Sequence, residues 1–292
     1  MTQLSITTDR EIYRPGEEIR GQVHVICDKL ETCEALRLDY KGVIQSRVIL
    51  GSGKHRRIYE NVIPVIDNSE TLLEAPEFQA GTNSFNFTLT IPRDAPGSYY
   101  GHNGWIQYSV SAVIEKKNWP DKTESTPIQI AWLASNPEMK SETIHWPYDK
   151  KEESPLELDI QDDVVTLGKD FTFKFRVQDQ QKLREVRAYL VYKEQVAPDG
   201  IKEAYLDKLG SWRIPDSELT RNSWIDVRLN TSNDWPLPLM SELVWTQYVL
   251  RVEVDVPFRF DHVAEIPLKV FYPFETREQE SETDTIFEWE KS

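Results

Sequence analysis

Cysteine and long apolar runs are scarce in this chain of 292 residues. Its two cysteines, Cys27 and Cys33, are too few for a disulfide scaffold, and with no secretion signal we expect both to stay reduced. No apolar run reaches the ~20 residues that a membrane-spanning helix needs. Without a secretion signal, the two glycosylation-type triplets, at Asn86 and Asn230, carry no information. We expect a soluble cytoplasmic protein that can associate peripherally with membranes.

Catalytic and metal-binding patterns are missing as well. The five histidines show no metal-ligand spacing, and no G-x-S-x-G nucleophile motif exists. The run GSGK at 51–54 lacks the first glycine of a phosphate-binding loop, and a histidine follows where Ser or Thr is required. Acidic runs at 159–163 and 261–265 could ligate calcium, although solvated turn residues are the simpler interpretation. We therefore expect no enzyme activity, no cofactor and no metal.

Charge is abundant but unevenly distributed. The formal net charge is −15, which argues against a nucleic-acid binder and against a polybasic membrane anchor. Residues 1–60 nevertheless hold 10 Lys or Arg against 9 Asp or Glu, so the rest of the chain carries the whole acidic excess. The N-terminal region is the part of the molecule where an acidic partner could bind.

Alternation of apolar and polar residues dominates the sequence, whereas a period of 3.6 residues is nearly absent. Ile19, Gly21, Val23 and Val25 alternate with polar residues directly after the corner Pro15–Gly16, in which Gly16 can adopt a positive φ. The same period-two pattern recurs along the chain, at 36–40, 85–91, 108–114, 128–130, 171–177, 190–192, 248–254 and 268–270. Nine such runs separated by turn residues predict an all-β protein.

An internal repeat divides the chain into two copies. Placing Gly16 on Gly168 aligns residues 19–25 with 171–177 and, without a gap, 37–41 with 189–193. A second register aligns 105–115 with 245–255. We predict two tandem immunoglobulin-like β-sandwich domains. Their expected bounds are an N-terminal sandwich at 1–133, a linker at 134–156, a C-terminal sandwich at 157–273 and an acidic tail at 274–292.

The tail and one loop are the candidate binding elements. The tail ends with apolar Ile286, Phe287 and Trp289, which a purely solubilising segment would not need, so we expect them to dock on this chain or on a partner. Lys54, Arg56 and Arg57 cluster with His55 in a glycine-flanked loop, and Arg14 and Arg20 lie in the same half of the chain. These five cations could bind an acidic or phosphorylated segment, the protein's own tail included. The alternative is a solvated hairpin tip.

The ordered motifs resemble a known family. The stretches YRPGEEIRGQVHV, ALRLDYKGV and FQAGTNSFNFTLTIPRDAPGSYYGHNGWIQYSVSAVIE resemble the arrestin N-terminal domain, most closely that of α-arrestins. The stretches PLPLMSELVWTQYVLRVEVDVP and EIPLKV are similar to the arrestin C-terminal domain. The retromer arrestin-like subunit and a bacterial sporulation-control protein share this fold. The resemblance implies a non-enzymatic adaptor or scaffold for cytoplasmic segments of membrane proteins or for trafficking and signalling partners.

The resemblance also implies where partners bind, and the chain departs from the family pattern at three points. Segments 45–60 and 61–79 would be variable loops that select the partner, with anionic lipid as a further contact. The Pro-Pro-x-Tyr motif of α-arrestins is absent, the first strand lacks the phosphate-sensing lysine pair, and no residues are assigned to a buried arginine–aspartate core. IFEWE at 286–290 fits a relaxed clathrin-box pattern, with tail docking on the first domain as the alternative. A self-assembling or regulatory arrestin-like protein without receptor cargo is the alternative function.

Overall fold

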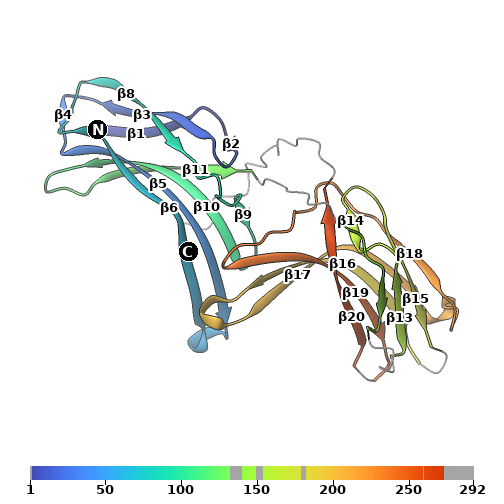
Figure 1. Ribbon diagram of the computed structural model, residues 1–292. Coiled ribbons are helices and arrows are strands. Elements are labelled where there is room, and N and C mark those ends of the chain that lie inside the picture. The colour runs from blue at the N-terminus through green and yellow to red at the C-terminus, as the bar shows by residue number, and fades with distance from the viewer. Residues whose placement is uncertain (1, 132–139, 149–153, 179–181, 259, 273–292) are drawn as a thin grey trace.

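Two β-sandwiches make up the molecule, joined side by side (Figure 1). The computed structural model describes residues 2–131, 140–148, 154–178, 182–258 and 260–272. Within these ranges the chain forms twenty strands and three short 3-10 turns. No helix among the described residues is long and apolar enough to cross a membrane. The all-β tandem sandwich predicted from the alternating sequence is therefore confirmed.

The first sandwich packs a three-stranded sheet against a larger one. Its strands are β1 (Thr2–Thr8), β2 (Ile12–Tyr13), β3 (Glu18–Cys27), β4 (Glu31–Thr32), β5 (Ala35–Leu50), β6 (Arg57–Glu74), β7 (Glu77–Phe78), β8 (Gly81–Thr90), β9 (Tyr99–Tyr100), β10 (Gly104–Glu115) and β11 (Lys122–Ile130). The small sheet has the order β1-β3-β8 and the large one β2-β11-β10-β5-β6, with β9 beside β10. β4 and β7 form a separate ribbon.

The second sandwich repeats this arrangement. Its strands are β12 (Ile144–Trp146), β13 (Leu156–Ile160), β14 (Val164–Thr166), β15 (Phe171–Val177), β16 (Glu185–Val196), β17 (Glu203–Pro215), β18 (Ile225–Leu229), β19 (Val244–Asp255) and β20 (His262–Phe271). The sheets are ordered β12-β13-β15-β18 and β14-β20-β19-β16-β17. Even the short parallel pair recurs, because β2 pairs with β11 as β14 pairs with β20. The sequence repeat thus corresponds to a repeat of topology.

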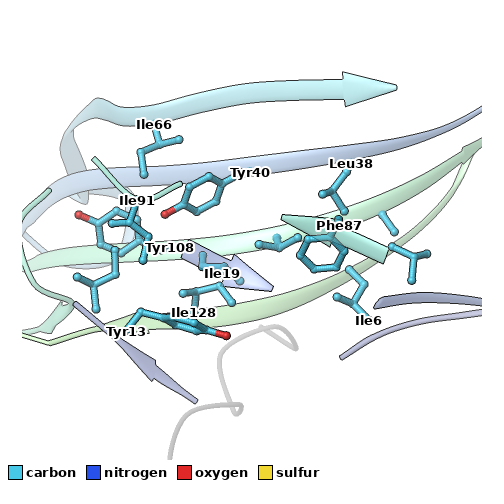
Figure 2. Close-up of a cluster of buried hydrophobic side chains, with 14 of the residues drawn as sticks. Ile6, Tyr13, Ile19, Leu38, Tyr40, Ile66, Phe87, Ile91, Tyr108 and Ile128 are labelled. Atoms are coloured by element: carbon cyan, nitrogen blue, oxygen red, sulfur yellow. The ribbon is translucent and has the colours of Figure 1, made fainter. Parts of the chain in front are cut away.

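Inward-facing alternate residues of the two sheets form the core of the first sandwich (Figure 2). Ile19, Leu38 and Ile106 are at most 1% exposed. Burying one such aliphatic side chain stabilises a fold by roughly 1.5–3 kcal/mol. The period-two pattern read from the sequence is therefore the pattern of core contacts.

One hydrogen bond marks the repeat at atomic level. The hydroxyl of Tyr108 donates to the carbonyl of Pro96 at 2.6 Å, and the hydroxyl of Tyr248 donates to the carbonyl of Pro236 at 2.9 Å. Both tyrosines are buried on the penultimate long strand of their sandwich. The two pairs stand at the same spacing along the chain, so each sandwich ties the loop before this strand to its core in the same way.

The corner at Pro15–Gly16 has the structural role predicted for it. Gly16 has φ of +86° and Gly168, its equivalent, has φ of +79°. The amide of Glu17 donates to the carbonyl of Arg14, and the amide of Gly16 donates to the carbonyl of Ile91, so the corner is a closed turn. It connects the short strand β2 to β3 and carries no exposed reactive group.

Two segments differ from the expectation. The expected linker, 134–156, contains β12, which pairs with β13, and the amide of Glu142 donates to Asp163 Oδ1. Part of it therefore belongs to the second sandwich. Segments 45–60 and 61–79, expected as loops, form mainly β5 and β6, which pair along almost their entire length. Pro64 and the many polar residues of β6 hid this strand from the alternation pattern, since it lies at a sheet edge and buries little.

Candidate functional site

The turn between β5 and β6 gathers the predicted cations at one exposed tip. Lys54 and His55 lie in a 3-10 turn, Gly53–His55, and Arg56 and Arg57 follow directly. All four side chains are exposed. Lys54, Arg56 and Arg57 make no side-chain hydrogen bond or ion pair with any other described residue. Figure 1 shows the tip projecting away from the body of the first sandwich. The tip therefore presents three uncompensated positive charges to solvent.

Glycine makes this tight turn possible. Gly51 and Gly53 have φ of +77° and +56°, a region that costs other residues energy. A Cβ on Gly51 would lie 2.5 Å from the carbonyl oxygen of His55. The amide of His55 donates to Ser52 O and the amide of Arg56 donates to Gly53 O. The GSGK run is thus a hairpin turn and has no phosphate-binding loop geometry.

Apolar side chains lie directly behind the cations. Ile49 and Ile58 are paired across the hairpin and therefore project from the same face. Both are exposed, as are Leu50 and Val62. An exposed apolar stripe beside free cations is typical of a binding surface, because solvent would otherwise disfavour it. We call Ile49, Leu50, Lys54, Arg56–Ile58 and Val62 the hairpin-tip surface.

The remaining predicted binding residues are located elsewhere. Arg14 lies in the β2–β3 corner, and Arg20 lies on the outer face of β3 in an ion pair with Glu18 at 2.9 Å. In Figure 1, β2 lies in the upper part of the first sandwich, away from the hairpin tip at the lower end of β5 and β6. The five predicted cations therefore do not form one cluster. Ile286, Phe287 and Trp289 of the tail lie outside the described residues.

A buried carboxylate joins the two sandwiches beside this hairpin. Glu194 of β16 is 3% exposed, and its oxygens accept hydrogen bonds from β9 and from the loop that follows it. The donors are the hydroxyl of Tyr99 at 2.7 Å, the amide of His102 at 3.0 Å and the amide of Asn103 at 2.6 Å. No described cation pairs with Glu194. Backbone and hydroxyl donors thus compensate for the burial of this charge.

The residues at the junction between the two sandwiches are closely packed, so few substitutions would fit there. A Cβ on Gly101 would lie 1.7 Å from Glu194 Oε2, so only glycine allows the loop to approach. Burial, with Tyr192 and Glu194 nearby, raises the pKa of Tyr99 far above its ordinary value, so the phenol remains a donor. His102 stacks on Tyr205 of β17 with ring centroids 4.1 Å apart. Val196 and Val244 of the second sandwich pack into the core of the first.

The other candidate sites have ordinary structural explanations. Among the described residues no group of three or more His, Cys, Asp or Glu side chains could hold a metal. Asp163 accepts from the amide of Glu142 and pairs with Lys269, and Asp261 pairs with Arg187. Cys27 and Cys33 are free thiols, and burial raises the pKa of each, that of Cys33 to about 11. Neither thiol is activated as a nucleophile.

Comparison with known proteins places this architecture in a family. The family model for the N-terminal domain of arrestin (or S-antigen) matches residues 2–133, which is the first sandwich. The first sandwich is an arrestin-like N-terminal domain. A mouse relative, "Arrestin domain-containing protein 4", is 29% identical over 133 residues, which cover 40% of this chain and 32% of the relative. The match thus spans about a third of that relative's length. The arrestin-like family identified from the motifs is confirmed.

Sequence reasoning did not find the domain junction of this arrestin-like protein. One signal for it was present. In β16 the side chains that point inward are those of Leu190, Tyr192, Glu194 and Val196. A carboxylate thus stands at a position where the alternating pattern predicts a buried apolar residue. A charged residue at such a position indicates either a buried polar contact or a strand that leaves its sandwich. Here both apply, since the end of β16 crosses to the first sandwich.

Proposed function

We propose that this arrestin-like protein is a non-enzymatic adaptor that binds acidic or phosphorylated cytoplasmic segments of membrane proteins. The observation that carries the proposal is the hairpin-tip surface, whose cations Lys54, Arg56 and Arg57 lack partners among the described residues. Membership of the arrestin-like family supports an adaptor or scaffold role in general. The identity of the bound segment is inferred from the chemistry of this surface.

Phosphate is the favoured ligand chemistry for the tip. Arg56 and Arg57 can each donate two parallel hydrogen bonds to phosphate oxygens, and charge-assisted bonds of this kind are roughly twice as strong as neutral ones. Ile49 and Ile58, on one face of the hairpin, favour a segment in which apolar residues flank the phosphorylated or acidic positions. A binding surface with both features discriminates better than charge alone, since screening weakens long-range attraction.

The rigid junction supports presentation of the hairpin. β5 continues from the core of the first sandwich into the tip, and the hydrogen bonds to Glu194 fix the second sandwich close to its stem. A hairpin held at its base orders fewer residues on binding than a free loop of the same length would. Less conformational entropy is then lost when a partner binds.

The acidic tail is the proposed competitor for this surface. Residues 274–292 carry most of their charge as Asp or Glu and end with Ile286, Phe287 and Trp289. Such a segment has the same combination of negative charge and apolar side chains that we propose for the partner. Tail docking would keep the cations covered until a membrane-protein segment displaces it, and phosphate would increase that segment's advantage.

Peptide binding tests the adaptor proposal directly. Fluorescence anisotropy would measure full-length protein against phosphorylated and unphosphorylated forms of acidic, apolar-flanked peptides. Lys54→Glu/Arg56→Glu/Arg57→Glu should weaken binding of the phosphorylated form at least tenfold. Arg14→Glu/Arg20→Glu, which reverses two charges far from the tip, is the matched control and should bind almost as wild type does. Equal loss in both variants would contradict a specific site, and binding to no peptide would favour the self-assembling alternative.

Removing the tail tests the proposed competition. Deletion of residues 275–292 should strengthen binding of the phosphopeptide, and of vesicles containing anionic lipid, because the surface is then uncovered. Replacing Ile286, Phe287 and Trp289 together with Ser should have the same effect while keeping the acidic charges. Unchanged affinity after both alterations would overturn the competition and leave the hairpin-tip site standing.

A further inference from the structure

The free edge of β8 lacks the usual protection against pairing with another strand. β3 is the only strand that pairs with β8 in the described part of the chain, so the far edge of this ten-residue strand is open. Its sequence, GTNSFNFTLT, contains no charged residue and no proline. Exposed edges normally carry charges, prolines or bulges that prevent strand addition. The pairing of β8 with β3 shows no bulge.

Two longer edge strands of the molecule do carry such protection. β6 has Pro64 together with five charged residues, and β17 has four charged residues and a bulge in its pairing with β16. β18, which takes the place of β8 in the second sandwich, is only five residues long and contains Asp226 and Arg228. β1, at the opposite edge of the same sheet, is also uncharged, but it has only seven residues, and Lys122 of β11 donates to the carbonyl of Thr2. Among the described edge strands, β8 is therefore the longest one without such protection.

The backbone of β8 directs its unpaired groups outward at alternate residues. The amide of Ile91 donates to Glu17 O, and the amide of Asp9 donates to Arg20 O on the opposite side of β3. Because hydrogen-bonded pairs alternate in an antiparallel ladder, the odd-numbered residues of β8 bond to β3. The even-numbered residues then point their amides and carbonyls to the free edge: Thr82, Ser84, Asn86, Thr88 and Thr90.

The inward side chains of β8 are also incompletely covered. Phe87 is buried, but Phe85 and Leu89 pack against the core while remaining partly exposed. An added strand would cover this apolar surface and pair the outward backbone groups at the same time. Both observations thus indicate a missing strand at the same edge.

We propose that a second copy of this chain supplies that strand, with β8 pairing antiparallel to β8 about a twofold axis through Asn86. In this register Asn86 faces Asn86 of the other copy, Ser84 faces Thr88 and Thr82 faces Thr90, so every pair consists of residues with outward backbone groups. On the inner face Phe85 lies opposite Phe87, an aromatic pair that stabilises strand pairing. The two small sheets then become one six-stranded sheet.

The absence of charged residues around β8 favours a second copy of this chain over an acidic or basic partner strand. The run 78–92 around β8 is uncharged, so self-pairing brings no like charges into contact. A single strand pair buries less than the roughly 800 Å² per partner of a standard stable interface. The dimer is therefore weak and concentration-dependent. It leaves the hairpin tip free, so this inference is independent of the proposed peptide binding.

Analytical ultracentrifugation of the full chain tests the dimer. Wild type should change from monomer to dimer as its concentration rises from micromolar to hundreds of micromolar. Asn86→Lys places two like charges opposite each other and should weaken dimerisation at least tenfold. Gln22→Lys is the matched control, since it removes the same Gln22–Asn86 hydrogen bond and adds the same charge one strand away from the edge. It should dimerise as wild type does.

Disulfide trapping tests the register. Antiparallel hydrogen-bonded residues have Cα atoms ~5.5 Å apart, within disulfide range. With copper phenanthroline as oxidant, Asn86→Cys should form a covalent dimer, whereas Ser84→Cys should form little, and wild type gives the background from Cys27 and Cys33. A monomer at every concentration would overturn the proposal. So would equal dimerisation of Asn86→Lys and Gln22→Lys, or trapping that does not depend on position.

Discussion

The two sandwiches share one topology but use their long hairpins in opposite ways. The hairpin β5–β6 of the first sandwich ends in free cations at an exposed tip. The equivalent hairpin β16–β17 instead docks on the first sandwich, where Glu194 accepts three hydrogen bonds. The duplicated fold thus uses one long hairpin to join the two sandwiches and leaves the other exposed, and we propose that the exposed one binds partners.

Core packing differs in a complementary manner. Gly21 of β3 lies opposite Phe87, whose ring fills the space above the glycine. At the equivalent position of the second sandwich, Phe173 lies opposite Val227. The large side chain is thus on the neighbouring strand in one copy and on the central strand in the other. The second pair has a valine where the first has a glycine, so the two copies fill this position with different total side-chain volumes.

Removal of the Glu194 carboxylate should have the largest effect on the difference between the two hairpins. Glu194→Ala leaves two buried amides and a tyrosine hydroxyl without an acceptor, at a cost on the order of 3 kcal/mol. The second hairpin should then behave like the first, detached at its tip. Small-angle X-ray scattering should show a broader distribution of distances between the sandwiches, and calorimetry should resolve two unfolding transitions. Glu203→Ala, on the exposed part of the same hairpin, is the control; identical behaviour of the two variants would contradict the role of Glu194.

A methyl group at Gly21 should selectively destabilise the first sandwich. Its Cβ would lie 2.4 Å from both the Phe87 ring and the carbonyl oxygen of Thr7, and the backbone oxygen cannot move aside. Overpacking of this kind costs about 2 kcal/mol. Denaturant unfolding of Gly21→Ala should show an earlier transition for the first sandwich only. Thr172→Ala, on an exposed position of β15, serves as control, and an unshifted midpoint in Gly21→Ala would show that the sheet can relax.

The equivalent corners should both respond to substitution. Gly16→Ala and Gly168→Ala each force alanine to a positive φ, at about 1 kcal/mol. Each variant should lower the stability of its own sandwich, as measured by hydrogen exchange of the adjacent strand, and Gly168→Ala should cost more because its Cβ would lie 2.1 Å from Asn233 Oδ1. If only one corner responds, the shared conformation is not the reason that both copies contain glycine.

Acid should weaken the first corner more than the second. A hydrogen bond from the Tyr13 hydroxyl lowers the pKa of Asp9, and one from the Arg14 amide lowers the pKa of Glu17. Since both folded pKa values lie below the ordinary values, the stabilisation is complete above about pH 5 and is lost as the pH falls through the folded pKa values. The repeat places Gln161 and Lys169 at these positions, so the second corner lacks both groups.

Both carboxyl groups are largely exposed, so the expected effect is below about 1 kcal/mol. Hydrogen exchange of the β2–β3 corner should be faster at pH 3 than at pH 7 after correction for intrinsic rates, and the β14–β15 corner should change less. Asp9→Asn/Glu17→Gln should remove the difference between the corners. A difference that persists in this variant would assign it to other groups.

The fold could be predicted from the sequence because the patterns that indicate its strands are local and occur in both halves of the chain. Alternation at 19–25 and 171–177, with a glycine before each run, indicates both strands and their equivalence. It did not reveal β6 or β12. β6 is an edge strand that buries few residues, and β12 is three residues long, so neither needs a regular apolar pattern.

The candidate site was only partly predictable. Lys54, Arg56 and Arg57 are adjacent in sequence, and a turn keeps adjacent residues together, so their clustering followed from the chain itself. Arg14 and Arg20 were grouped with them only by position in the first half of the chain, and strand pairing separates them. The contact of Glu194 with Tyr99 spans 95 residues, a pairing that depends on how two domains dock.

The most direct test of the contrast between the hairpins is nuclear magnetic resonance of the isotope-labelled full chain, titrated with an acidic phosphopeptide. If the first hairpin is the binding hairpin, amide shifts should change at residues 49–62 and hardly at all at 198–206 of the second. The shifts of 49–62 should stay unchanged in Lys54→Glu/Arg56→Glu/Arg57→Glu at the same peptide concentration. Shift changes confined to the second hairpin, or to Arg14 and Arg20, would contradict the assignment of binding to the first hairpin.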